Sequence, residues 1–294
     1  MKEKVAIILV NYNGKNYNEE CINSILKSTY KNYEIIVVDN NSIDNSVELL
    51  VEKFDNNIKI ITSESNLGFS GANNLGIKYA LENEFDYVML LNNDTVIDKD
   101  MIKIMVDSSF NSVVVSPKIY YYDDKNILWS AGGRINWFKG LSIQYGINEM
   151  DNEENNKKKE IEFATGCCIL IPIQAIKKVG MMSEDYFLYY EDTDYCVRLI
   201  RKGFKIIYEP KAVLYHKVSA TTGGEKSKMY WYYMTRNRLI FNKKFNKTIS
   251  YKIYYLLTMT IKLIRYLVLR DKTALSGSVS GIVDFFKGIE AKRS

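Results

Sequence analysis

The sequence has little of the chemistry on which disulfide-bonded and zinc-bound domains depend. It contains one histidine, three prolines and four cysteines among 294 residues. The cysteines include no CxxC pair, so their spacing indicates neither a zinc site nor a dithiol redox motif. We expect Cys21, Cys167, Cys168 and Cys196 to be small core residues with free thiols, as in proteins of the reducing cytosol.

A long hydrophobic run is also missing near the N-terminus. Lys2 and Lys4 precede an apolar segment, but this segment (residues 5–10) is too short for the core of a signal peptide. It suits a first buried strand. Together with the free cysteines, it predicts a cytoplasmic protein.

Short apolar runs alternate with amphipathic stretches over the first hundred residues. Four short runs predict strands, at residues 5–10, 34–38, 58–61 and 88–91. The first, second and fourth suit strands buried on both faces, and residues 88–91 show no polar alternation at all. Helical spacing between the runs predicts an α/β fold, with a parallel sheet wrapped by helices and a nucleotide at the strand ends. Further along, we expect a strand to break at Pro117 and two separate strands at 204–208 and 212–215.

Charge is distributed unevenly along the chain. Residues 226–294 contain 15 Lys and Arg against 3 Asp and Glu, a net charge of +12, whereas residues 1–225 carry −7. A basic tail on an acidic body predicts an anionic partner surface, either a membrane or a nucleic acid.

Residues 250–269 decide between these partners. The segment is apolar and close to the roughly 20 residues that span a bilayer, yet Lys252, Lys262 and Arg265 would be costly in hydrocarbon. We therefore favour a helix lying in the membrane interface over one packed on the rest of the chain or on a second copy in a homodimer. Nucleic acid is disfavoured because the segment is too apolar for a phosphate-contacting surface.

Polar residues follow the predicted strands, where α/β sheets bind ligands. Asn11 and Tyr12 leave the first strand, and Asp39 follows the second, either to contact a base or ribose or to form an Asx-turn. Asn92 and Asp94 follow the fourth. A carboxylate there could hold a divalent cation against a diphosphate, although a turn before a helix explains the same residues.

The glycine-rich stretch at 66–76 is not a known phosphate loop. Gly71 and Gly76 have the Walker separation, but Ile77 stands where that motif needs lysine. The glycines still allow the backbone to approach phosphate or sugar closely. Asn66, Asn73 and Asn74 can supply hydrogen bonds to such a ligand, and Asn66, Gly68 and Asn74 are the residues expected to bind it.

A second group of acids precedes a predicted helix near residue 195. Acids at a helix N-terminus are favourable for the helix dipole. Three of them in four residues exceed that need and indicate a general base over a pocket; they are Glu191, Asp192 and Asp194. His216 ends a predicted strand, and a single histidine is more often a packed or surface residue than a ligand.

Taken in order, these stretches resemble the family-2 glycosyltransferases, especially the rhamnosyltransferase-like branch of polysaccharide synthesis. The matching pieces within residues 4–240 are VNYN at 10–13, VVDNNS at 37–42, NLGF at 66–69, NNLG at 73–76, LLNNDT at 90–95, TGC at 165–167, EDTD at 191–194 with Arg198, His216, and RN at 236–237. The resemblance implies a GT-A fold, a Rossmann-like mixed sheet with a helical C-terminal extension. Its catalytic domain would be residues 1–228, with a nucleotide-binding half to about 116 and an acceptor half from 117; residues 229–294 would form the extension.

The resemblance also implies roles for single residues. Asp192 would be the catalytic base, Asp39 would contact the nucleotide base, and Asp94 with His216 would hold Mg²⁺ or Mn²⁺. The other donor-binding residues would be Asn11, Tyr12, Asn66, Gly68, Asn74 and Asn92, and the acceptor-side or supporting residues Glu191, Asp194 and Arg198. One departure is that Asn92 replaces the first acid of the DxD motif, which leaves Asp94 as its only carboxylate.

These implications predict an inverting glycosyltransferase on the inner face of the cell membrane. It would move a sugar from dTDP-rhamnose or a UDP-sugar to a hydroxyl of a lipid-linked surface glycan. A sugar nucleotidyltransferase would carry a basic, glycine-rich loop after the first strand, unlike residues 11–14 here. A non-catalytic membrane scaffold would not need Asp94, Asp192 and His216 together.

Overall fold

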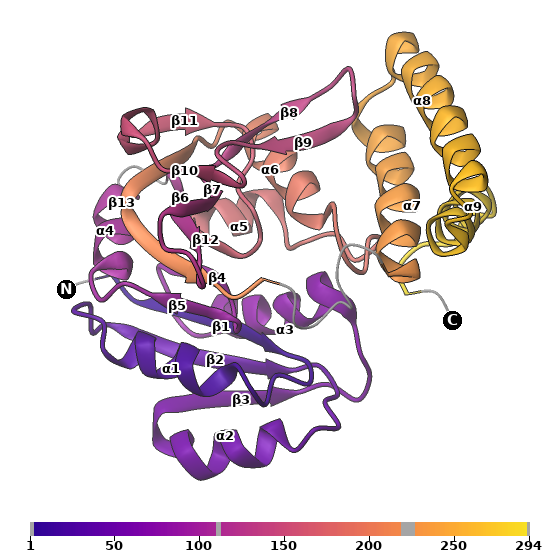
Figure 1. Cartoon of the computed structure of the whole chain (residues 1–294). Helices are drawn as coiled ribbons and strands as arrows, with labels where there is room; N and C mark the ends of the chain where they lie inside the picture. Colours follow the sequence, from indigo (N-terminus) through magenta and orange to yellow (C-terminus); the bar gives the residue numbers. More distant parts are fainter. Residues whose placement is uncertain (1–2, 110–112, 219–226, 293–294) are drawn as a thin grey trace.

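A computed structural model describes residues 3–109, 113–218 and 227–292. One large mixed sheet forms its centre, with the strand order β10-β7-β6-β12-β4-β1-β2-β3, and β13 joins β6 to β5 and β11 (Figure 1). The strands are β1 (Val5–Asn11), β2 (Tyr33–Asp39), β3 (Ile58–Thr62), β4 (Tyr87–Asn92), β5 (Thr95–Ile97), β6 (Val114–Tyr121), β7 (Ile127–Ser130), β8 (Gly133–Asn136), β9 (Leu141–Gln144), β10 (Glu149–Met150), β11 (Lys159–Ile161), β12 (Cys168–Pro172) and β13 (Ile206–His216).

Helices lie on both faces of the sheet. The core on one face takes residues from α3, α5 and α6, and the core on the other takes residues from α1, α2 and α4. The helices are α1 (Asn18–Leu26), α2 (Ser46–Phe54), α3 (Gly68–Glu82), α4 (Met101–Ser108), α5 (Ile173–Val179), α6 (Glu191–Arg201), α7 (Lys228–Phe245), α8 (Ile249–Val268) and α9 (Lys272–Phe286), with short 3-10 turns η1 (Asp55–Asn57) and η3 (Glu153–Asn156). The predicted α/β class is confirmed.

The four strands predicted from the first hundred residues pair in parallel with one another. Strand β1 pairs in parallel with β2 and β4, and β2 pairs with β3. Ile7 and Ile8 are both fully buried, but they pack into the cores on opposite faces. Burial on both faces is the reason that this strand has no polar alternation.

The prediction that Pro117 interrupts a strand is wrong. Strand β6 runs through Pro117, and its neighbour β13 shifts register between Glu209 and Val213 at that level. A proline cannot donate to the ladder, so it is tolerated beside a bulge where the ladder is already irregular. The same bulge joins the two strands predicted at 204–208 and 212–215 into the single strand β13.

Three C-terminal helices stand to one side of the sheet (Figure 1). Helices α7 and α9 pack closely against each other at two glycines of α9. A Cβ added at Gly277 or Gly281 would lie only 2.6 Å from a backbone carbonyl oxygen of α7. Helix α8 contacts α9 and lies at the edge of the molecule (Figure 1). Within the described residues, no helix has the length and apolarity that a membrane crossing requires.

Strand register places the polar strand ends at one edge of the sheet. Asn11 pairs with Asp39 across β1 and β2, and Val10 pairs with Asn92 across β1 and β4. Strand β12 runs antiparallel to β4, and the backbone N–H of Asn92 donates to the Cys167 carbonyl at 2.8 Å. Sequence segments far apart therefore meet at this edge.

Candidate active site

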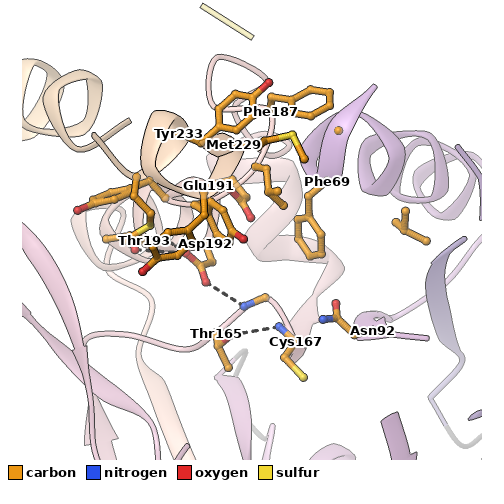
Figure 2. Close-up of a pocket in the computed structure, with 18 of the residues that line it drawn as sticks. Phe69, Asn92, Thr165, Cys167, Phe187, Glu191, Asp192, Thr193, Met229 and Tyr233 are labelled. Atoms are coloured by element: carbon orange, nitrogen blue, oxygen red, sulfur yellow. Dashed lines mark hydrogen bonds between the residues drawn. The ribbon is translucent and has the colours of Figure 1, made fainter. Parts of the chain in front are cut away.

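A cleft of about 970 Å³ opens at the carboxyl ends of β1, β2 and β4. Its floor comes from the strand ends, and its walls come from the start of α3, the start of α6 and the start of α7 (Figure 2). Of the residues predicted for the site, it is lined by Tyr12, Asn66, Gly68, Asn92, Asp94, Glu191, Asp192 and His216.

A chain of side-chain hydrogen bonds supports the floor from behind. Asn93 Nδ2 donates to Asn18 Oδ1 at 2.7 Å, and Asn18 Nδ2 donates to Asn11 Oδ1 at 2.8 Å. Asn11 Nδ2 donates in turn to Asp39 Oδ1 at 2.7 Å. Asn11 and Asp39 are almost fully buried, so they are placed to orient the floor of the cleft rather than to line it.

Asp39 accepts a local backbone hydrogen bond, but from three residues on rather than from the second residue as in an Asx-turn. The Ser42 amide donates to Asp39 Oδ2 at 3.1 Å. Asn40, the next residue, lines the cleft, and its Nδ2 donates to Asn66 Oδ1 at 3.0 Å. Of these two neighbours, Asn40 therefore faces the cleft, whereas Asp39 lies behind it.

Gly68 allows the backbone at the start of α3 to lie against the segment before α6. Its φ is +74°, and a Cβ there would lie 2.3 Å from the Phe187 carbonyl oxygen. That carbonyl accepts a hydrogen bond from the Phe69 amide at 2.7 Å. Only glycine fits such a left-handed, crowded position without strain.

Asp94 and His216 face each other across the floor. Asp94 Oδ1 lies 3.2 Å from His216 Nε2, yet within the described residues Oδ1 has no partner of hydrogen-bond geometry, and neither has His216 Nδ1. Two donors bound at about 2.0–2.1 Å to an octahedral cation lie about 3 Å apart. The spacing of the two groups would therefore allow both to hold one divalent cation.

The ring of Trp129 limits how His216 can move. The two rings meet edge to face, with centroids 4.5 Å apart. Trp129 also lines the cleft. No group of three or more His, Cys, Asp or Glu that could hold a metal occurs in the described part of the chain.

Asp192 projects from the first turn of α6 towards the cleft (Figure 2). Its Oδ2 accepts from the Gly166 amide at 3.2 Å, and its Oδ1 accepts from the Thr193 amide at 2.7 Å. Burial raises the pKa of Asp192, and these hydrogen bonds oppose the rise. The carboxylate is thus held in one orientation by two separate segments.

Glu191 is more deeply buried than its neighbour. Burial raises the pKa of Glu191 well above its usual range, and the Asp192 carboxylate raises it further. Its Oε2 is buried and has no hydrogen-bond partner among the described residues. A protonated Glu191 beside an ionised Asp192 avoids two adjacent buried charges.

Three of the predicted site residues make contacts outside the cleft. Asn74 Nδ2 donates to the Met182 carbonyl at 3.0 Å. Asp194 forms an ion pair with Arg198 at 2.6 Å and accepts from the Tyr186 hydroxyl at 2.9 Å. These contacts support the walls of the cleft.

Several cleft residues were missed from the sequence. Asn40 and Phe69 stand inside recognised motifs, so the motif itself was the available signal. Thr165 and Gly166 also belong to such a motif, and a Cβ at Gly166 would lie 3.0 Å from the Phe69 ring. Trp129 had no signal, because it lies in a short strand of the irregular middle region.

Comparison with known proteins agrees with this geometry. A family model described as "Glycosyl transferase family 2" matches residues 6–180. The low-salt glycan biosynthesis hexosyltransferase Agl10 of Haloferax volcanii is 29% identical over 274 residues, which cover 92% of this chain and 85% of that protein.

Two further proteins are similar to this chain. A poly-beta-1,6-N-acetyl-D-glucosamine synthase of Staphylococcus aureus is 28% identical over 78% of this chain, which spans about half (54%) of that protein. The mannosyltransferase PcManGT of Pyrobaculum calidifontis, solved with GDP-Man and Mn²⁺, has a TM-score of 0.59 and 14% identity over 99% of this chain and 89% of its own. The last likeness shows the fold.

Proposed function

The chain belongs to glycosyl transferase family 2, and we propose that it moves a sugar, with inversion, from a nucleoside-diphosphate sugar to a hydroxyl group of a glycan acceptor. Its activity as a glycosyltransferase follows from the family. The observation that carries the finer proposal is that Asp94, His216 and Asp192 line one cleft at the strand ends. Such a cleft can hold a diphosphate on its floor and an acceptor hydroxyl against its wall.

The reaction needs one proton removed and one leaving group accepted. Asp192 takes the proton from the acceptor hydroxyl as general base. The acceptor oxygen then forms a bond to the anomeric carbon while the bond from that carbon to the diphosphate oxygen breaks. The electron pair of the broken bond leaves with the nucleoside diphosphate, and attack from the opposite side inverts the configuration.

Residues on the floor would hold the diphosphate. Asp94 and His216 would bind Mg²⁺ or Mn²⁺, and this assignment is supported by Asp94 Oδ1, which is buried and has no hydrogen-bond partner among the described residues. When bound, such a cation neutralises negative charge on the departing diphosphate. Tyr12, Asn66 and Asn92 line the same cleft and would contact the nucleotide and its sugar. The Mn²⁺ in the PcManGT complex is consistent with this proposal.

We further propose that the acceptor is linked to lipid and that the enzyme works at the inner surface of the cell membrane. Seven apolar side chains of α8 are each 55–75% exposed and follow helical spacing along one face; they are Ile253, Leu256, Leu257, Ile261, Ile264, Leu267 and Val268. A stripe of this size on a protein surface marks a membrane or protein contact.

The basic residues of the extension favour the membrane. At 100° per residue, Lys252 and Arg265 flank the stripe, so they can meet anionic headgroups while the stripe enters the lipid. Lys262 lies on the opposite side of the helix, where burial and the nearby Arg238 lower its pKa. The Trp231 and Tyr266 rings lie 5.5 Å apart, which places the far end of α8 beside the first turn of α7. Residues of that turn line the cleft, so a lipid-linked acceptor could reach it from the membrane.

A donor panel tests the reaction. The full-length protein would be incubated with UDP-, dTDP- and GDP-sugars, with Mn²⁺ or Mg²⁺, and its melting temperature would be recorded. A ligand that binds the native state at 100 times its Kd should stabilise it by about 2.7 kcal/mol. The donor that does so should be turned over, and Asp192→Asn should lower kcat by roughly 10²–10⁴-fold while still binding it.

Two results would overturn this proposal. One is that no nucleotide sugar of the panel stabilises or is consumed by the wild-type protein. The other is that Asp192→Asn retains the wild-type kcat, which would remove Asp192 from the role of base.

A further inference from the structure

Residues 186–190 connect the two sides of the cleft and have unusual backbone angles. Phe187, Tyr189 and Tyr190 have φ values of 65°, 68° and 75°. Side-chain-bearing residues rarely adopt this left-handed region, and they persist there only where their surroundings enforce it. Tyr190 directly precedes Glu191 and Asp192, so the path of this segment determines where the acids of α6 begin.

Asn237 of α7 enforces this path from behind. Its side chain is fully buried. Its Nδ2 donates to the Tyr186 carbonyl at 2.9 Å and to the Leu188 and Tyr189 carbonyls at 2.8 Å each. The NH₂ group has two N–H donors, so one of them is shared between two of the three carbonyls. One side chain thus binds three backbone carbonyls of the segment that contains the left-handed residues.

Arg236 completes the support. It is also fully buried, and its Nε donates to Asn237 Oδ1 at 3.0 Å, which orients that amide. Its Nη2 donates to the Tyr186 carbonyl at 2.9 Å, and its Nη1 donates to the Ala291 carbonyl at 2.7 Å. Arg236 therefore links residues 186–190 to Ala291, near the C-terminal end of the described chain.

We propose that Asn237, oriented by Arg236, is a positioning residue for catalysis: it holds residues 186–190 in the conformation that directs Asp192 into the cleft. The inference rests on the proposed role of Asp192 as base. It assigns to the C-terminal extension a part in the chemical step, in addition to any contact with membrane.

The test separates positioning from general stability. Asn237→Ala removes the three hydrogen bonds without adding a charge. The matched control is Asn246→Ala at the other end of α7, where a buried asparagine donates to the Trp137 carbonyl at 2.6 Å, away from the cleft. Both variants should melt at lower temperature than wild type. Only Asn237→Ala should lower kcat, by on the order of 10²-fold, because small misplacements of reacting groups have effects of that size.

Donor affinity provides the second measurement. Titration with the nucleotide sugar that the donor panel identifies should give a Kd for Asn237→Ala within about threefold of wild type, since the floor of the cleft is unchanged. Should Asn237→Ala not fold, Arg236→Lys keeps the charge but loses the forked hydrogen bonds, and its kcat should fall at least about tenfold.

The outcomes are distinct. A folded Asn237→Ala or Arg236→Lys with wild-type kcat would overturn the inference, and so would an equal loss of kcat in Asn246→Ala. Asp192→Asn is assayed in parallel. If that variant were fully active, the role of Asp192 would fail instead.

Discussion

Adjacent carboxyl groups on α6 meet different surroundings. Asp192 accepts hydrogen bonds from Gly166 and Thr193, which favour its ionised form. Glu191 has a buried oxygen without a partner among the described residues, and burial raises the pKa of Glu191 well above its usual range. Two acids that are neighbours in sequence are thereby separated into one that can be an ionised base and one that stays protonated. This separation predicts how stability depends on pH.

Glu191→Gln should change the pH dependence of stability. Because the folded pKa of Glu191 is raised above the unfolded value of about 4.3, its stabilising contribution is complete below that value and is lost as pH rises through the folded pKa. Each unit of difference costs about 1.4 kcal/mol once the group must ionise. The melting temperature of Glu191→Gln should therefore decline less than that of wild type between pH 5 and pH 9. Parallel curves for the two proteins would contradict this explanation.

At the scale of elements, the contact of α7 with α9 depends on small residues. Gly281 would place a Cβ 2.6 Å from the Tyr232 carbonyl oxygen and 3.1 Å from the Arg236 nitrogen. Helix α9 is therefore close enough to α7 that backbone meets backbone. This contact supports the helix from which Arg236 and Asn237 reach the cleft.

Gly281→Ala tests that contact by the sign of its effect. In an exposed helix, replacing glycine by alanine stabilises by up to about 1 kcal/mol. Here the added methyl must displace backbone, so we expect destabilisation by about 1–3 kcal/mol in urea unfolding. Ser276→Ala, at an exposed position of the same helix, is the control and should be neutral or slightly stabilising. A stabilised Gly281→Ala would show that α7 and α9 do not pack this closely.

On the scale of the whole molecule, the two ends of the chain present different surfaces. The cleft lies at the edge of an acidic α/β domain, and the exposed stripe lies on α8 in a basic extension. The boundary between a catalytic domain (residues 1–228) and an extension (residues 229–294) stays a prediction. Helix α7 belongs to the predicted extension, yet its buried Arg236 and Asn237 support the wall of the cleft. Binding to a membrane and catalysis would thus occur on one connected body.

Flotation with vesicles tests the stripe. Wild-type protein should float with vesicles of phosphatidylcholine and phosphatidylglycerol. Leu257→Glu should bind at least about tenfold more weakly, because burying a leucine side chain contributes roughly 1.5–3 kcal/mol. Ile43→Glu makes the same kind of change at an exposed isoleucine (86%) of the catalytic domain and should float like wild type.

The alternatives for the stripe have their own results. Absence of flotation by wild type, or equal flotation of wild type and Leu257→Glu, would reject the membrane proposal. Light scattering that finds a wild-type dimer and a Leu257→Glu monomer would assign the stripe to a second copy of the chain.

Local sequence was enough for the elements whose cause is local. Apolar runs predicted β1, β2 and β4, because the central positions of a strand buried on both faces must be apolar. Strand β3 was predicted from a shorter run, and at the end of the sheet order its Lys59 is exposed. The acids of α6 and the apolar segment of α8 were found in the same way, since helical spacing is written in neighbouring residues. Motif order also predicted the family, because ligand-binding residues follow particular strands.

Tertiary structure decided what depends on distant partners. Pro117 continues β6 only because β13 bulges beside it, more than ninety residues later in the chain. Asn74 supports a wall of the cleft because Met182 lies against it, a contact that no local pattern records. Asn237 was visible as part of a motif, but its contact with three carbonyls of residues 186–190 arises only when α7 packs behind that segment. A hydrogen bond between distant segments forms only after folding brings them together, so the sequence does not show it. The spacing of apolar residues in a helix or strand, in contrast, can be read directly from neighbouring residues.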